Sequence, residues 1–170
     1  IPGGAGNLGL YEKFLKGLPN GVDIDLQAVV NKVFETIALA KVSTSGEEAR
    51  ENNFLDFADS VSVNPDHLIY DAKQAAIALY DAGYRAPVKK KVKVVGAPGY
   101  ATLLLGAQGM YDSGFISEYD LAIAKKLAFV LAGGLVPYGT EVEEEYILGL
   151  EKKVFLELIQ HPKTQQRMQH

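Results

Sequence analysis

The hydrophobic and polar residues of this chain alternate mostly with the period of amphipathic helices. The clearest case is residues 26–38, where apolar side chains recur every three or four positions after Asp25, a residue type that caps helix N-termini. The members of this stripe are Leu26, Val29, Val30, Val33, Phe34, Ile37 and Ala38. Such a stripe usually packs against a core, so we expect one side of this helix to be buried.

Start and stop signals place further helices along the chain. Capping residues stand at Ser45, Asn64, Ser117 and Thr140, and glycine or proline follows each helical pattern. The expected helices are residues 7–16, 45–53, 64–82, 98–111, 117–132 and 140–160. Short strands are expected near 60–63 and 92–95. The fold class is therefore mainly α, with six or seven helices and one or two short strands.

The sequence also indicates which faces of the later helices are buried. In 64–82 the apolar side is Leu68, Ile69, Ala72, Ala76, Leu79 and Tyr80; in 117–132 it is Leu121, Ala124, Leu127, Ala128 and Leu131; in 140–160 it contains Tyr146, Leu150, Val154 and Leu158. Gly106 and Gly109 lie inside a helix pattern, where glycine is unfavourable, so we expect them to mark a close helix crossing.

Composition excludes several classes of function. With 48% hydrophobic and 22% charged residues in 170, the chain has the composition of one globular domain. A net charge of -4 argues against nucleic acid as a partner, and the lack of a long apolar run argues against a membrane span. The absence of cysteine excludes disulfides and fits a cytoplasmic protein. No metal site is expected, because the acidic run 141–145 suits the positive end of a helix dipole.

The one basic run lies in residues 85–96, where Lys89, Lys90, Lys91 and Lys93 surround alternating valines. Pro87 disfavours a helix here, and the alternation suggests an extended segment. Two interpretations stay open. The run is a soluble connector or edge strand, or it is a basic clamp for the phosphates of coenzyme A.

The first residues, Ile1-Pro2-Gly3-Gly4-Ala5-Gly6-Asn7, form a glycine-rich turn that leads directly into a helix. Such a turn brings free backbone N–H groups close to a ligand. Gly4, Gly6 and Gly9 also match G-x-G-x-x-G, and Asp23 and Asp25 lie near the offset of a ribose-binding acid. The dinucleotide interpretation fails on context, because no strand pattern precedes the turn and a helix pattern follows Asp25.

The turn resembles the I-P-G-[AG]-[AG]-G loop of the crotonase, or enoyl-CoA hydratase, superfamily. The resemblance implies that Pro2, Gly3 and Gly4 lie at the substrate, and that the backbone amide of Gly3 contacts the catalytic water. It also implies that the two catalytic glutamates precede Ile1. We therefore expect the chain to be the C-terminal part of a longer polypeptide.

Segments 67–73, 99–106, 133–140 and 162–168 are similar to the end of bacterial bifunctional 3-hydroxyacyl-CoA dehydrogenase/enoyl-CoA hydratases. The resemblance implies acyl-CoA as substrate and assigns residues 1–63 to the end of the crotonase-like core and 64–170 to its helical extension. No cofactor is expected in this chain, and NAD would bind the parent's dehydrogenase domain.

Two expectations follow if the front half of the domain is absent. The chain alone should be inactive, and it should self-associate through Val29, Val33, Phe34 and Ile37, because these side chains would lack the sheet that covers them. A free-standing helical interaction or scaffold module without catalysis is the alternative that the sequence leaves open.

Overall fold

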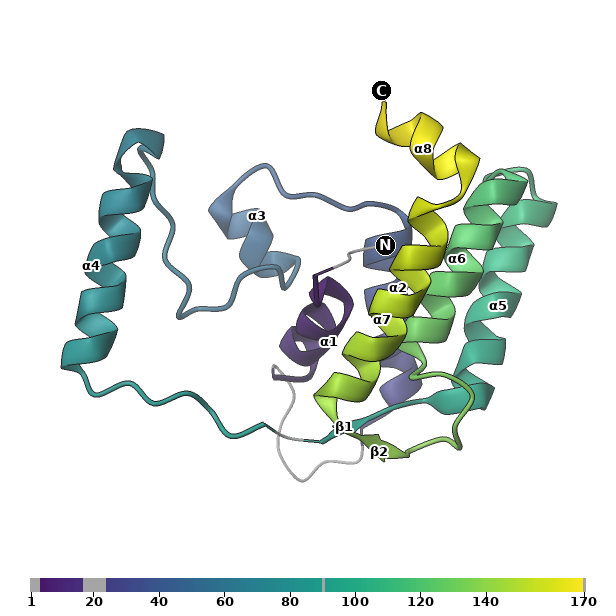
Figure 1. The fold of residues 1–170 in the computed structure, drawn as a ribbon, viewed down its shortest axis with the longest axis horizontal. Helices are drawn as coiled ribbons and strands as arrows, with labels where there is room; N and C mark the ends of the chain where they lie inside the picture. Colours follow the sequence, from purple (N-terminus) through teal and green to yellow (C-terminus); the bar gives the residue numbers. More distant parts are fainter. Residues whose placement is uncertain (1–3, 17–23, 90, 170) are drawn as a thin grey trace. The chain divides into compact units, whose positions relative to one another are not determined.

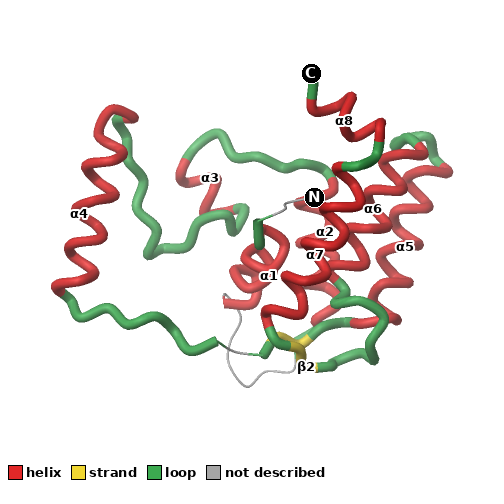
Figure 2. Tube along the Cα trace, viewed as in Figure 1, coloured by secondary structure: helices red, strands yellow, loops and turns green. Residues whose placement is uncertain are grey.

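The computed structural model describes residues 4–16, 24–89 and 91–169, and the chain divides into two compact units. Unit 1 comprises Ile1–Val42 and Lys90–His170, and unit 2 is Ser43–Lys89. The described residues contain eight α-helices, seven of them with seven residues or more, one short 3₁₀ helix and one two-stranded sheet (Figure 1 and Figure 2). The predicted mainly helical fold class is confirmed.

Unit 1 is a helical bundle built around α6. This helix contacts α1, α2, α5 and α7, and Figure 1 shows it between α5 and α7. Its predicted apolar face is buried, from Leu121 to Leu131. The elements of unit 1 are α1 (Gly6–Lys16), α2 (Leu26–Ala38), β1 (Val92–Lys93), α5 (Gly96–Asp112), α6 (Glu118–Leu131), β2 (Glu141–Val142), α7 (Glu144–Ile159) and α8 (Pro162–Met168).

Local capping chemistry fixes several helix starts where the sequence predicts them. The Asp25 carboxylate accepts the backbone N–H groups of Gln27 and Ala28 at the start of α2. Ser117 and Asp120 form a complete capping box at the start of α6. Each of these side chains satisfies donors that the first helical turn cannot pair internally.

The apolar stripe of α2 is largely covered inside unit 1. Val30 and Val33 are fully buried, and Phe34 and Ile37 are partly buried. Helices α1, α5 and α6 supply the contacts. We expected self-association because these side chains would lack a covering surface. That premise was wrong, because the bundle itself covers the central positions.

A small antiparallel sheet pairs β1, which precedes α5, with β2, which follows α6. Val92 pairs with Val142 and Lys93 with Glu141, and the pairing continues through the Val94 N–H, which donates to the Thr140 carbonyl at 3.0 Å. Thr140 therefore does not cap α7 as predicted, because its backbone belongs to this extended pairing. The strand expected at 92–95 is confirmed for Val92–Lys93.

The close approaches of α5 occur near its start. A Cβ on Gly96, whose φ is +58°, would lie 2.0 Å from the Val136 carbonyl oxygen, and one on Gly99 would lie 2.2 Å from Val95 Cγ2. A Cβ on Gly106 or Gly109 would meet nothing within 4 Å. The prediction that these last two mark a close crossing was wrong. The helix starts at Gly96, before the predicted position, because the N–H groups of Gly96 and Ala97 donate to the Ala132 and Val136 carbonyls.

Unit 2 contains α3 (Gly46–Glu51), η1 (Pro65–His67) and α4 (Leu68–Asp81). Ser45 caps α3 and Asn64 caps η1 through their side-chain oxygens, as predicted. Residues 60–63 are not a strand. Val61 instead packs on α3, where its Cγ2 lies 2.8 Å from the Cβ position of Gly46, so the segment has no neighbouring strand with which to pair.

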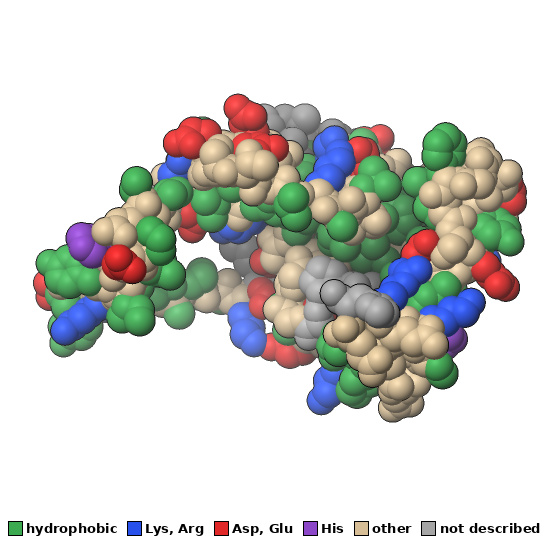
Figure 3. All heavy atoms as spheres, turned by 90° about the horizontal axis from the view of Figure 1, so that it is seen from above, with side chains coloured by type: hydrophobic (Ala, Val, Ile, Leu, Met, Phe, Trp, Pro, Cys, Tyr) green, Lys and Arg blue, Asp and Glu red, His purple; other side chains and the backbone are tan. Residues whose placement is uncertain are grey.

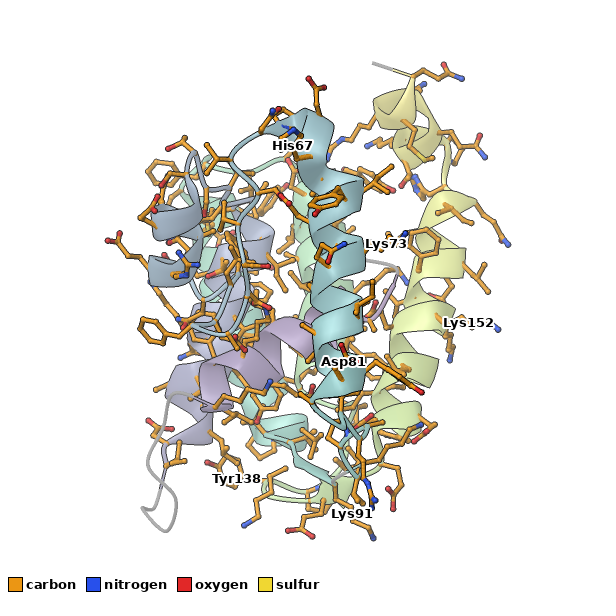
Figure 4. The ribbon with its side chains drawn as sticks, turned by 90° about the vertical axis from the view of Figure 1, so that its left-hand side faces the viewer. His67, Lys73, Asp81, Lys91, Tyr138 and Lys152 are labelled. Atoms are coloured by element: carbon orange, nitrogen blue, oxygen red, sulfur yellow. The ribbon has the colours of Figure 1, made fainter. Side chains whose placement is uncertain are left out.

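Helix α4 forms where predicted, but no residue of it is buried. Figure 4 shows its length between the labelled His67 and Asp81, and Figure 3 shows hydrophobic side chains at its surface. Its expected apolar face, including Ile69 at 84% exposed, has no cover within unit 2. The domain boundary expected between residues 63 and 64 does not coincide with the limits of these compact units. It concerns a different division of the chain and stays a prediction.

Candidate functional site

Gly4 and Ala5, the described end of the glycine-rich turn, directly precede α1. Pro2 and Gly3, the predicted substrate-binding and catalytic positions, lie outside the described residues. Gly4 is exposed, and a Cβ on it would meet nothing within 4 Å. Ala5 has a left-handed φ of +65°, and its carbonyl accepts the Gly9 N–H at 2.9 Å as α1 begins. The turn is therefore open to solvent at Gly4 and fixed from Ala5 onward.

A buried carboxylate fixes that turn. The Ala5 N–H donates to Glu151 Oε1 at 2.8 Å, across 146 residues of sequence. Glu151 lies on α7 and is only 2% exposed, whereas its neighbour Lys152 projects away from the helix (Figure 4). Glu151 Oε2 accepts no hydrogen bond in the part of the chain that the structure describes. The carboxylate also stands at the N-terminal end of α1, where the helix dipole favours negative charge.

The sequence analysis did not identify Glu151. It placed Tyr146 and Leu150 on the buried side of the last long helix, but the buried positions are Ile147, Glu151, Val154 and Leu158. Tyr146 is 41% exposed, so its assignment to the buried face was wrong, whereas Leu150 is half-buried. The spacing of the four buried positions is helical, and a charged residue within an apolar stripe was the available signal.

Helix α1 is anchored by its inward face. Asn7, Leu8, Leu10 and Tyr11 are buried, and the Tyr11 hydroxyl donates to the Lys93 carbonyl at 2.7 Å. Burial raises the pKa of the Tyr11 phenol far above its usual value, with a smaller contribution from Tyr138. The hydroxyl therefore stays protonated and remains a donor to β1.

An apolar groove of about 370 Å³ runs between α2 and α5. Its walls are Phe34, Ala38, Leu39, Leu103, Gly106 and Met110, with Asn31, Glu35 and Thr102 as the polar members. Glu35 is held at the rim by Lys41 at 2.6 Å, and this hydrogen bond, with the charge of Lys32, lowers the pKa of its carboxyl group. The groove combines an apolar wall with a polar rim, which is the usual character of a small-molecule site.

A second depression, of about 540 Å³, lies where α8 meets the start of α6. The Tyr119 ring stacks on His161 with centroids 4.5 Å apart, and its hydroxyl is hydrogen-bonded to the Thr164 hydroxyl. Lys163 and Arg167 lie over the same ring, at 5.6 and 5.2 Å. These contacts attach α8 to the bundle, and sequence periodicity gave no indication of them.

Two lysines of the basic run lie at or near the small sheet. Lys93 lies in β1, and Lys91 forms an ion pair with Glu143 at 3.4 Å. Lys90 lies outside the described residues. Lys91 and Lys93 thus lie near the small sheet. The interpretation of the run as a clamp for the phosphates of coenzyme A stays a prediction.

In the part of the chain that the structure describes, no group of three or more His, Asp or Glu side chains could hold a metal ion. No helix within residues 4–16, 24–89 and 91–169 is both long and apolar enough to cross a bilayer.

Comparison with known proteins gives one informative match. All 170 residues of the chain are 59% identical to a probable 3-hydroxyacyl-CoA dehydrogenase of Bacillus subtilis (strain 168), and they span 21% of that protein. No family model matches the chain, and no solved structure matches it. The expected relationship is therefore confirmed at the level of the dehydrogenase, whereas the hydratase assignment remains a prediction. The chain is related over its full length to about a fifth of a probable 3-hydroxyacyl-CoA dehydrogenase.

Proposed function

We propose that the chain is the helical C-terminal part of an enoyl-CoA hydratase-like domain in a protein that also carries an NAD-dependent 3-hydroxyacyl-CoA dehydrogenase. The observation that carries the proposal is the 59% identity, over the full chain, to a probable 3-hydroxyacyl-CoA dehydrogenase. The hydratase part of the proposal rests on the resemblance of residues 1–7 to the crotonase loop.

The two reactions are chemically consecutive. Addition of water across the double bond of a trans-2-enoyl-CoA produces a 3-hydroxyacyl-CoA, which a dehydrogenase then oxidises by transferring hydride to NAD. In the hydration step two glutamates handle the proton and the water, and two backbone amides stabilise the enolate oxygen. By the resemblance, these groups and the NAD site lie in other parts of the parent protein.

The contribution of this chain would be a backbone amide and an apolar wall. Gly3, by resemblance, directs its N–H to the catalytic water, beside Pro2 and Gly4. The exposure of Gly4 and the fixed turn at Ala5 support such a role. The groove between α2 and α5 has the apolar lining that an acyl chain requires. The parent would be cytoplasmic and would take acyl-CoA as its substrate.

The test compares the 170-residue chain with the full-length parent protein. We expect the parent to hydrate crotonyl-CoA and to oxidise a 3-hydroxyacyl-CoA with NAD, and the isolated chain to do neither. Calorimetry should detect no NAD binding by the chain, because Gly4, Gly6 and Gly9 lack a βαβ frame. A parent that oxidises but does not hydrate would remove the hydratase from the proposal, and turnover by the chain alone would contradict the assignment of the catalytic groups.

A matched pair of variants in the parent tests the loop. Gly3→Ala keeps the backbone N–H, whereas Gly3→Pro removes it. If that N–H holds the catalytic water, Gly3→Pro should lower the hydratase kcat by about 10²-fold or more relative to Gly3→Ala, as loss of one aligned donor does elsewhere. The dehydrogenase activity is the internal control. Equal hydratase rates in the two variants would exclude this role for Gly3.

A helical interaction module remains the second candidate, and the apolar side of α4, which the rest of unit 2 does not cover, favours it. The coding sequence upstream of Ile1 separates the two. An in-frame strand followed by a glycine-rich, glutamate-containing segment supports the hydratase, and its absence supports the module.

A further inference from the structure

Glu151 is a costly residue at its position. It is 2% exposed, lies in line with Ile147, Val154 and Leu158, and forms no ion pair with any described residue. A buried carboxylate loses its hydration, and an apolar side chain of the same volume often serves stability equally well or better. Packing alone therefore does not account for glutamate here.

Among the described residues, this carboxylate accepts a hydrogen bond from the turn that precedes α1. Oε1 accepts the Ala5 N–H at 2.8 Å, and Ala5 has a φ of +65°, a conformation that residues with a side chain rarely adopt. The peptide group is planar, so fixing the Ala5 N–H also fixes the Gly4 carbonyl in the same plane. The carboxylate thereby fixes the orientation of the Gly4–Ala5 peptide group just before α1.

We propose that Glu151 is a positioning residue for the hydratase reaction: from α7, it holds the Gly4–Ala5 peptide, the described end of the glycine-rich turn, in one orientation. This inference rests on the proposed function. The reacting atoms are not touched by Glu151 itself. Its effect passes through a peptide plane, and small errors in the placement of a reacting group reduce turnover strongly.

The test uses the full-length parent with three variants. Glu151→Met keeps a buried side chain of similar volume but removes the acceptor, whereas Glu151→Gln keeps an acceptor oxygen without the charge. Glu157→Gln is the matched control, because Glu157 lies on the same helix but is exposed and paired with Lys126 at 2.5 Å. Hydratase kcat and KM, dehydrogenase activity and thermal unfolding are measured for each.

We expect Glu151→Met to lower the hydratase kcat by about 10-fold to 100-fold, with KM and dehydrogenase activity within about twofold of the wild type. Glu151→Gln should restore most of this loss, and Glu157→Gln should resemble the wild type. A hydratase kcat in Glu151→Met equal to the wild-type value would overturn the inference alone. A parallel loss of both activities with a lowered unfolding temperature would assign Glu151 to stability and also overturn it. A wild-type parent that hydrates no enoyl-CoA would overturn the proposed function and this inference together.

Discussion

Replacing Gly106 by alanine should stabilise the protein. The same change at Gly99, in the same helix, should not, because a steric clash offsets the gain in helix propensity. Both residues lie within α5, where alanine is favoured over glycine by about 1 kcal/mol. At Gly106 the new methyl group meets nothing within 4 Å, so the whole gain should appear. At Gly99 it would lie 2.2 Å from Val95 Cγ2 and 2.6 Å from Gln27 Oε1.

The size of the difference follows from how far these neighbours can move. Val95 is fully buried, so its side chain cannot turn into solvent, and overpacking of this kind costs about 1–3 kcal/mol. The two variants should therefore differ by about 1–3 kcal/mol in the free energy of unfolding. Gly106→Ala should also raise the melting temperature by about 2–4 °C.

Urea unfolding followed by far-UV circular dichroism measures this difference through the transition midpoint at unchanged slope. Gly109→Ala is a second open-space variant, and Gly133→Ala is a second crowded one, since its φ is +73° and the Cβ would lie 2.6 Å from the Val94 side chain. Destabilisation by Gly106→Ala, or equal stability of the Gly99 and Gly106 variants, would refute the reasoning.

Three further changes test other contacts. Val33→Glu should destabilise the chain by about 3 kcal/mol or more, because Val33 is fully buried in its own bundle, and the unfolding midpoint should not depend on protein concentration as a dimer interface would require. Tyr11→Phe should cost about 1 kcal/mol in a denaturant titration, because the Lys93 carbonyl loses its hydrogen-bond donor. Hydrogen bonds from Arg167 and, next in size, from Ser117 lower the pKa of Asp120 from 3.8 to about 2, so these contacts should stabilise the fold above pH 4 and lose their effect as the pH falls towards 2. Asp120→Asn should flatten that acid-side decline in thermal unfolding scans.

Local sequence signals were sufficient for most helix positions and for the class of fold. The Asp25 cap, the Ser117 capping box and the stripe from Leu121 to Leu131 depend only on residues within a few positions of one another. Such signals carry the same meaning in any tertiary context. Helices α2 and α6 were therefore predictable almost to the residue.

The errors occur where distant segments of backbone meet. Strand β2 formed in place of a longer α7 because the Val94 and Thr140 backbones pair, and α5 begins early because Gly96 bonds to the Ala132 carbonyl. The same holds for the candidate site. Gly4 could be identified from the glycine pattern. Glu151 could be noticed only as a charged residue within an apolar stripe, and no local signal indicated its partner Ala5, 146 residues away.

The contact between Ala5 and Glu151 also has a consequence for how the bundle folds. Helices α5, α6 and α7 are near neighbours along the chain, so their packing closes only short loops, whereas α1 must find α7 across 146 residues. The entropic cost of loop closure grows with loop length, and contacts of high sequence separation slow folding. We therefore expect α5–α7 to form an early nucleus and α1 to dock late, so that the glycine-rich turn acquires its geometry only after the rest of the bundle is complete.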